Sequence, residues 1–292
     1  MVRYYYKSWG MKMKYSEGYL VSRDGKQLFF CEWRTDNSPK GVVCLVHGLG
    51  EHCGRYVHVA SKLTDAGYCV IAFDLPGHGK SQGKRGHIRS YKILQQDISM
   101  LISEAVKRYQ DIPCYLYGHS LGGNLVLNYA LGNDSRLAGI ISTSPWLKLA
   151  FKPKSLMILI GKILEKIWPS FTQSNRLNTE GLSHRTEVAE AYTNDPYVHD
   201  KISVRLFNRA NVHGLLAIKK ASQCKLPILL MHGSADPITS HKASRQFAEN
   251  AGAVCTYKEW EDLYHELHNE SNSEEVIQYI IDWMQAVSDK NK

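Results

Sequence analysis

The sequence predicts an α/β fold in which helices flank a mostly parallel central sheet. Short continuous apolar runs, such as residues 42–46 and 68–73, alternate with amphipathic helical patterns, as expected for strands that are covered on both faces. This alternation breaks over residues 145–222 and then resumes. We therefore expect a core formed by residues 17–144 and 223–292, with residues 145–222 inserted as a helical cap over the carboxyl edge of the sheet.

Length and composition fit an ordinary globular protein. A chain of 292 residues, 43% of them hydrophobic, can bury a sizeable core. The net charge of +8 suits attraction to an anionic surface, and a solvated basic face explains it equally well. Nucleic acid is a less expected partner, because the chain has no basic recognition helix and no aromatic-basic RNA motif.

The seven cysteines are odd in number and show no metal-type spacing. This usage indicates free core thiols in a reducing compartment. The amino terminus lacks the apolar region of a signal peptide, and no apolar run approaches the ~18 residues of a membrane span. The sequence thus predicts a cytoplasmic protein, with peripheral contact to a membrane left open.

The elements of the core follow one another in a regular order. Residues 1–16 are aromatic and basic without a clear period, so a disordered leader, a membrane-touching arm and an appended sequence all stay open for them. A turn signal at residues 22–25 then predicts a β-hairpin. Further strands are expected at 42–46, 68–73, 114–119, 137–143, 226–232 and 254–260, and helices at 55–66, 90–109, 121–131, 241–250 and 274–287.

The inserted segment contains helical patterns but no convincing strand. Its clearest helix covers residues 155–168, where Ser155, Lys162, Glu165 and Lys166 lie close together on a helical wheel and leave a broad apolar face. Such a helix either packs on the core or faces lipid. We expect this helix and its lysines to contact an anionic lipid surface.

The stretch Gly118-His119-Ser120-Leu121-Gly122 fits the Gly-x-Ser-x-Gly pattern of a nucleophile on a tight strand-to-helix turn. Glycines on both sides let neighbouring backbone approach a turn too tight for side chains, so the serine hydroxyl stands exposed beyond the sheet edge. The backbone N–H of Leu121, at the helix start, would then face a developing oxyanion. The structural alternative is a glycine-rich turn whose serine only caps the helix.

A serine nucleophile needs a base, and the base needs an orienting acid. Around such a turn the three residues follow in the chain order Ser, Asp or Glu, His. Asp236 and His265 each follow a predicted strand, which puts both at the sheet edge that carries Ser120. Asp262 competes with Asp236 as the orienting acid, and His268 competes with His265 as the base.

A second oxyanion donor is expected in the loop after the first parallel strand. His47-Gly48-Leu49-Gly50 occupies this position. We assign the role to the backbone N–H of Leu49, paired with that of Leu121. The alternative is a glycine turn that only the chain path requires.

Five motifs, in this order, resemble those of monoacylglycerol lipases, and the resemblance covers roughly residues 17–288. The motifs are His47-Gly-Leu-Gly-Glu-His-Cys-Gly-Arg-Tyr56, Asp74-Leu-Pro-Gly-His-Gly-Lys-Ser81, Gly118-His-Ser-Leu-Gly-Gly123, Gly233-Ser-Ala-Asp236 and Tyr264-His-Glu-Leu-His-Asn-Glu270. The resemblance implies an α/β-hydrolase core with a helical cap, and hydrolysis of a single acyl ester on glycerol. It also implies that Arg55, Tyr192 and His268 help to hold the glycerol end or its bound water.

The predicted activity is hydrolysis of monoacylglycerol by a serine esterase, through an acyl-enzyme on Ser120 and without a metal or organic cofactor. Leu49 and Leu121 depart from the residues common in the family, but both oxyanion contacts come from backbone. The cap matches the family least, so head group and acyl length stay open. A lysophospholipase or a broader carboxylesterase is the alternative among enzymes, and a non-catalytic lipid-binding module is the alternative outside them.

Overall fold

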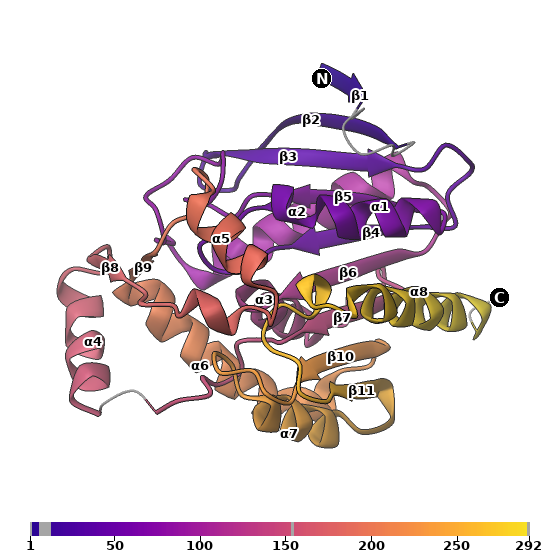
Figure 1. Ribbon diagram of the computed structural model, residues 1–292. Helices are drawn as coiled ribbons and strands as arrows, with labels where there is room; N and C mark the ends of the chain where they lie inside the picture. Colours follow the sequence, from indigo (N-terminus) through magenta and orange to yellow (C-terminus); the bar gives the residue numbers. More distant parts are fainter. Residues whose placement is uncertain (1, 6–12, 153–154, 291–292) are drawn as a thin grey trace.

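The computed structural model describes residues 2–5, 13–152 and 155–290. Its centre is a sheet in the order β1-β2-β3-β5-β4-β6-β7-β10-β11 (Figure 1). The first three strands and the β3–β5 pair are antiparallel, and all other neighbours are parallel. The sheet is thus mostly parallel, as the sequence predicts. The strands are β1 (Val2–Tyr5), β2 (Lys14–Val21), β3 (Gln27–Arg34), β4 (Gly41–Val46), β5 (Tyr68–Phe73), β6 (Cys114–His119), β7 (Gly139–Thr143), β10 (Ile228–Gly233) and β11 (Cys255–Trp260).

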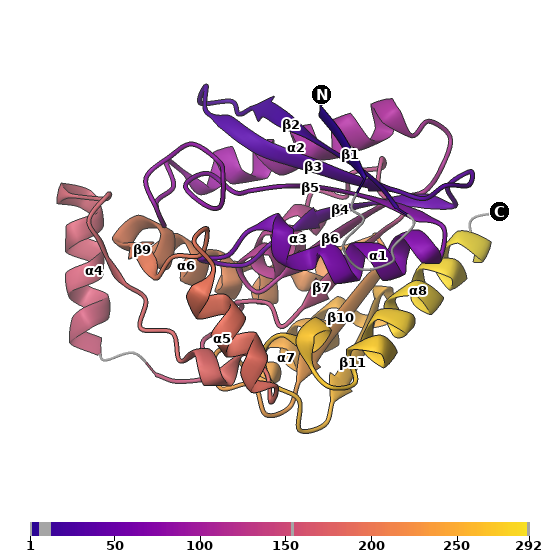
Figure 2. The ribbon, with the colours of Figure 1, turned by 45° about the horizontal axis from the view of Figure 1, so that its top comes forward.

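Helices cover both faces of this sheet. On one face α1 (Val57–Asp65) and α8 (Ser273–Lys290) pack together over one hydrophobic cluster (Figure 2). The other face carries a second cluster with side chains from α2 (Tyr91–Arg108), α3 (Leu121–Ala130), α6 (Val204–Lys220) and α7 (His241–Ala251). Short 3₁₀ turns occur at Cys53–Tyr56, Thr179–Gly181, Ala221–Gln223, Gly252–Val254 and Leu267–Asn269.

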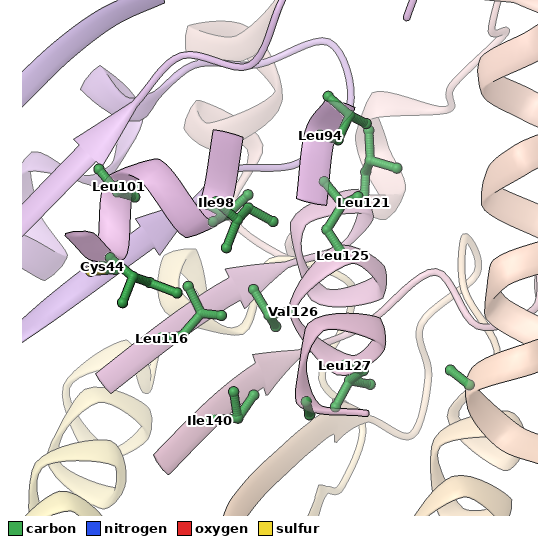
Figure 3. Packing of buried hydrophobic residues seen from close by; sticks show 14 of the residues in the cluster. Cys44, Leu94, Ile98, Leu101, Leu116, Leu121, Leu125, Val126, Leu127 and Ile140 are labelled. Atoms are coloured by element: carbon green, nitrogen blue, oxygen red, sulfur yellow. The ribbon is translucent and has the colours of Figure 1, made fainter. Parts of the chain in front are cut away.

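The second cluster holds the helix after β6 firmly against the sheet. Leu121 and Leu125 of α3 meet Leu94 and Ile98 of α2, and Leu116 projects from β6 below them (Figure 3). All five side chains are at most 1% exposed, and fully burying such a side chain contributes about 1.5–3 kcal/mol. This packing fixes the start of α3, where the candidate nucleophile lies.

We call residues 145–222 the cap segment. Besides α6 it contains α4 (Ser155–Ile167) and α5 (Thr186–Asn194). The expectation of no strand in this segment is wrong, because β8 (Thr172–Ser174) and β9 (Lys201–Ser203) pair antiparallel. Each of these strands has only three residues, among which Ile202 is the single apolar one, so neither shows the alternation of apolar residues that marks a strand.

Two parts of the cap segment are attached in different ways. The stretch before α6 is fastened to the core, because the His199 amide donates to Gly50 O and the Ser203 amide donates to Gly86 O, each over 2.8 Å. Helix α4 stands at the edge of the molecule and packs on α6 (Figure 1). There, Glu165 accepts from Nε of Arg209 over 2.6 Å.

The core begins earlier than the predicted boundary at residue 17. Strand β2 starts at Lys14 and pairs with both β1 and β3. The Ser16 hydroxyl is buried and donates to Glu32 over 2.9 Å, so these residues belong to the sheet. Residues 1 and 6–12 of the expected leader, and residues 153–154 of the cap segment, lie outside the described ranges. Within those ranges, no helix combines the length and the apolar character needed to cross a bilayer.

Candidate active site

Ser120 lies at the abrupt turn between β6 and α3. Its backbone has φ 54° and ψ −112°, a strained conformation for a residue with a side chain. Glycines permit the turn: a Cβ on Gly118 would lie 2.3 Å from Gly122 O, and one on Gly122 would lie 2.0 Å from Val46 O. The Ser120 side chain makes no capping hydrogen bond to the helix. Its hydroxyl is therefore available for another partner.

That partner is His265. Its Nε2 lies 3.0 Å from Ser120 Oγ, and its Nδ1 lies 2.7 Å from Oδ2 of Asp236. Asp236 follows β10 and His265 follows β11, so the loops after β6, β10 and β11 bring the three side chains to one edge of the sheet. With Nδ1 donating to the carboxylate, Nε2 is free to accept the serine proton. We call these residues the candidate triad.

The charges around the candidate triad favour an imidazolium at His265. Burial by itself lowers the pKa of His265, but the nearby carboxylates, Asp236 first among them, outweigh burial and raise it above its ordinary value. Burial likewise favours the neutral form of Asp236, but His265 and His232 hold the pKa of its carboxyl far below the usual range. The arrangement stabilises the ion pair that forms when the serine loses its proton.

The loop after β4 runs directly beside the nucleophile. A Cβ on Gly48 would lie 3.2 Å from Cβ of Ser120, and Leu49 lines the cavity next to it. Leu121 is the first residue of α3, a position whose backbone N–H has no acceptor within the helix. The two amides expected to bind an oxyanion thus come from the two backbone segments that border Ser120.

A cavity of about 570 Å³ opens over Ser120 and His265, between the core and the cap segment. Most of the surface that lines it is apolar. The cap segment contributes much of this wall, and its apolar residues there include Trp146, Leu149, Phe151, Leu177, Leu182, Ile202, Val204 and Phe207. Polar groups lie among them, notably Glu51, Tyr192 and Glu266. The cavity can therefore take an extended apolar chain joined to a small polar group.

Of the three residues expected at the glycerol end, Tyr192 alone lines the cavity. Arg55 is nearly buried and pairs with Glu51 and Glu266. His268 is completely buried, stacks on Tyr56 with ring centroids 4.8 Å apart, and has no hydrogen-bond partner for either ring nitrogen among the described residues. Arg55 and His268 therefore lie behind the cavity wall.

The competing residues for acid and base do not join the candidate triad. Asp262 is exposed on a turn with φ 58°, where its amide donates to Ser234. His268 contacts the ring of His119, with the centroids 4.9 Å apart, and not Ser120. In the structure it is Asp236 and His265, and not Asp262 or His268, that form the hydrogen bonds leading from Ser120.

Other residues at the site were not singled out from the sequence. Thr239 supports Asp236 through its hydroxyl at 2.8 Å and its amide at 3.0 Å. Glu51 and Glu266 both pair with Arg55 in a buried cluster beside the candidate triad. Glu51 stands four residues before an arginine, a spacing that could have suggested a pair. Thr239 and Glu266 carried no such signal, because their partners are distant in the chain or in irregular loops.

Comparison with known proteins identifies the family of this chain. The family described as serine aminopeptidase S33 matches residues 37–272. A monoacylglycerol lipase of Mycolicibacterium smegmatis is 30% identical over 271 residues, which cover 92% of this chain and 96% of that protein. An uncharacterized abhydrolase domain-containing protein of Dictyostelium discoideum is 39% identical over 91% of this chain, although the chain spans only 28% of that relative.

A solved structure gives the same result. The crystal structure of a monoacylglycerol lipase from Paleococcus ferrophilus has a TM-score of 0.82 at 37% identity, covering 89% of this chain and 99% of that one. The predicted α/β-hydrolase fold and the predicted resemblance to monoacylglycerol lipases are thus confirmed. This chain belongs to the serine hydrolase family described as serine aminopeptidase S33, and monoacylglycerol lipases are among its relatives.

Proposed function

We propose that this protein hydrolyses monoacylglycerol to glycerol and a free fatty acid, with Ser120 as the nucleophile. The observation that carries the proposal is the chain of hydrogen bonds from Ser120 through His265 to Asp236, at 3.0 and 2.7 Å, beneath a largely apolar cavity. Membership of a serine hydrolase family with monoacylglycerol lipases among its relatives supports the same substrate class.

The reaction has two steps. Ser120 Oγ attacks the ester carbonyl carbon while His265 Nε2 takes the serine proton, and the resulting oxyanion accepts hydrogen bonds from the amides of Leu49 and Leu121. His265 then gives its proton to the glycerol oxygen as the bond to the acyl carbon breaks. Water, deprotonated by His265, releases the fatty acid from the acyl-enzyme, and the serine regains its proton.

The cavity supports a single acyl chain on a compact polar group. Apolar side chains such as Phe207 and Leu149 suit the acyl chain, and Tyr192 is the candidate contact for the glycerol end. The Tyr192 hydroxyl is buried and has no hydrogen-bond partner among the described residues, so a substrate hydroxyl or a bound water would satisfy it. Both ring nitrogens of His268 lack a hydrogen-bond partner among the described residues. This supports a second contact, in which a water molecule links His268 to the glycerol end of the substrate.

Replacing the nucleophile tests the proposal. Ser120→Ala should abolish turnover of a monoacylglycerol and labelling by a fluorophosphonate probe, because both need the serine oxygen. The fold should stay intact, as judged by circular dichroism. Ser103→Ala, at an exposed serine of α2, is the matched control and should behave as wild type. A well-folded Ser120→Ala protein that still cleaves monoacylglycerol would sink the assignment.

The head group is tested separately. Wild-type protein should cleave a monoacylglycerol faster than a lysophosphatidylcholine with the same acyl chain. The opposite preference would replace the proposed function by a lysophospholipase activity. Absence of any adduct at Ser120 would favour a lipid-binding module instead.

We further propose that α4 brings the protein to an anionic membrane surface. Its outer side exposes Leu159, Ile160, Ile163 and Ile167, and exposed lysines lie beside them at positions 162 and 166. Apolar side chains can enter the acyl boundary of a bilayer while lysines contact the headgroups. Gly161, on the side of the same helix that faces α6, lines the cavity, so α4 lies between the proposed lipid contact and the site that receives the substrate. Free thiols suit a peripheral protein in a reducing compartment.

A further inference from the structure

A buried cluster of three charges lies beside the candidate triad. Nη1 of Arg55 donates to Glu51 Oε2 over 2.6 Å and to Glu266 Oε1 over 2.7 Å. Nη2 of Arg55 donates to Glu266 Oε2 over 2.8 Å. The arginine side chain is 9% exposed, and the two carboxylates are 3% and 2% exposed. The pairing with Glu266 is bidentate, the arrangement that fixes both partners most strictly.

The first carboxylate is bound to the loop that carries the expected oxyanion donor. Oε1 of Glu51 accepts from the Gly48 amide over 2.6 Å and from the Tyr56 hydroxyl over 2.7 Å. A Cβ on Gly48 would lie 2.8 Å from this oxygen, so the side chain turns back closely on its own loop. The Gly48 amide immediately precedes the peptide whose N–H belongs to Leu49, so this hydrogen bond restrains the loop at the residue before the expected donor.

The second carboxylate directly follows the candidate base. Glu266 is the neighbour of His265 in the chain, and its amide donates to Leu182 O over 2.7 Å. Its Oε2 also accepts from the Asn269 side chain over 2.7 Å. Burial favours the neutral form of Glu266, but Arg55 holds the pKa of its carboxyl far below the usual range. The loop of His265 is thus tied to Arg55 by a permanent ion pair.

The arginine has little freedom to serve a substrate. Its guanidinium lies over the ring of Tyr192, 4.7 Å from the centroid, so α5 covers one of its faces. The carboxylates hold both Nη atoms, and Arg55 is not among the residues that line the cavity, whereas Glu51, Glu266 and Tyr192 are. If Arg55 left either carboxylate to bind glycerol, that carboxylate would remain as a buried charge without its partner.

We propose that Glu51, Arg55 and Glu266 form a positioning clamp that holds the Leu49 loop and the His265 loop in one fixed relation. The proton acceptor and one oxyanion donor come from loops more than 200 residues apart in the chain, and the clamp joins them by direct contacts. An error of about 1 Å between such groups can cost about 100-fold in rate. Arg55 is therefore a positioning residue and not a ligand of the glycerol end. The inference rests on the proposed function only in taking Ser120 as the nucleophile.

The clamp also contributes to the charge around His265. The titratable or polar groups near this imidazole include Asp236, Glu266, Glu51, His119, His268, Ser120 and Thr239. Arg55 stays charged at all working pH values, so removing the charge of Glu266 makes the surroundings of His265 more positive. The imidazolium then loses its proton more easily. The pH at which kcat/KM rises on the acidic side should fall.

Two variants separate geometry from charge. Glu266→Gln removes one charge and weakens the bidentate pair, whereas Arg55→Lys keeps the charge but cannot bridge both carboxylates with a planar fork. Each is assayed on p-nitrophenyl butyrate and on a short-chain monoacylglycerol, with active sites counted by fluorophosphonate titration. We expect both variants to lose about 10-fold or more in kcat per active site on both substrates, with KM within about twofold. The acidic limb should move to lower pH in Glu266→Gln and stay in place in Arg55→Lys.

Arg245→Met is the matched control, because it breaks an exposed arginine pair with Glu259, and it should leave kcat and the pH profile unchanged. An unchanged kcat per active site in Arg55→Lys would overturn the clamp and leave the cluster a purely structural role. A KM that rises on the monoacylglycerol alone, with normal kcat, would overturn it in favour of a glycerol ligand. Wild-type protein that cleaves p-nitrophenyl butyrate but no monoacylglycerol would refute the proposed substrate, and the clamp would still be tested on the first ester.

Discussion

Asp236 forms hydrogen bonds through both of its carboxylate oxygens. Besides His265, its Oδ2 receives the Thr239 hydroxyl over 2.8 Å and lies 3.0 Å from Nε2 of His232. Its Oδ1 receives the amides of Ile238 and Thr239 over 2.7 and 3.0 Å. Donors on every side keep the carboxylate ionised and orient it toward a single nitrogen of His265. The neutral imidazole is therefore held in the tautomer that can accept the serine proton.

At the residue scale, Asp236→Asn should leave the fold intact and lower kcat by about 10³–10⁴-fold. Only a neutral His265 can act as base, so kcat/KM rises with pH through the pKa of His265. The carboxylate raises that pKa, and its removal should move the acidic limb to lower pH. A pH series of kcat/KM measures both effects. The control is Asp262→Asn, at the exposed competing carboxylate, and a comparable loss there would contradict the assignment of the acid.

At the element scale, long elements could be predicted from the sequence and short ones could not. Buried strands such as β4 and β6 can be predicted because each is a continuous, mostly apolar run of residues. Strands β8 and β9 have three residues each and depend on a tertiary pairing that leaves no periodic pattern. The same limit applies to the site. The Gly-x-Ser-x-Gly turn has a local signature, whereas the contact between Arg55 and Glu266 joins residues 211 positions apart.

The β2–β3 hairpin offers a test of stability at this scale. Its turn is anchored to α2 by the Ser22 hydroxyl, which donates to the buried Asp97 over 2.7 Å. Burial raises the pKa of Asp97 to about 6. A carboxyl whose pKa is higher in the folded chain stabilises the fold at low pH, and this contribution is lost as the pH rises through about 6.

Asp97→Asn should therefore gain stability relative to wild type at pH 8, by about 1–2 kcal/mol, and little at pH 4, where the carboxyl is protonated in the folded chain and about half protonated in the unfolded one. Thermal unfolding at the two pH values measures the difference, which should appear as a rise in Tm of a few degrees at pH 8 only. Asp282→Asn, at an exposed position of α8, is the control. An equal effect at both pH values would show that ionisation of Asp97 is not the cause.

At the scale of the whole molecule, charge and exposed apolar area act together. The net charge is +8, and the cap segment presents exposed apolar side chains on α4. Ile160→Glu combined with Ile163→Glu should weaken binding to phosphatidylserine-containing vesicles by about 10-fold or more. The reason is that negatively charged side chains would replace apolar side chains that are proposed to enter the bilayer. Vesicle sedimentation measures the binding. Hydrolysis of a water-soluble ester should change little.

The matched control places glutamates at two exposed apolar positions of the core, Val21 and Val106. It adds the same charge far from α4 in the sequence and should reduce vesicle binding much less. If the two double variants lost binding equally, net charge alone would explain membrane contact and α4 would have no special part. If neither lost binding, the membrane proposal would be withdrawn.

The unequal attachment of the cap segment has a consequence for how such an enzyme can diversify. The stretch around His199 is bonded to the loop that borders the nucleophile, so changes there disturb bond cleavage itself. Helix α4 is held through α6, away from the catalytic atoms, yet it still contributes to the wall of the cavity. Substitutions in α4 can thus accumulate with little cost to the reaction rate while they alter which lipids enter. Substrate preference and the rate of hydrolysis can therefore change independently. Substitutions in α4 can alter which lipids bind without changing any residue of the candidate triad.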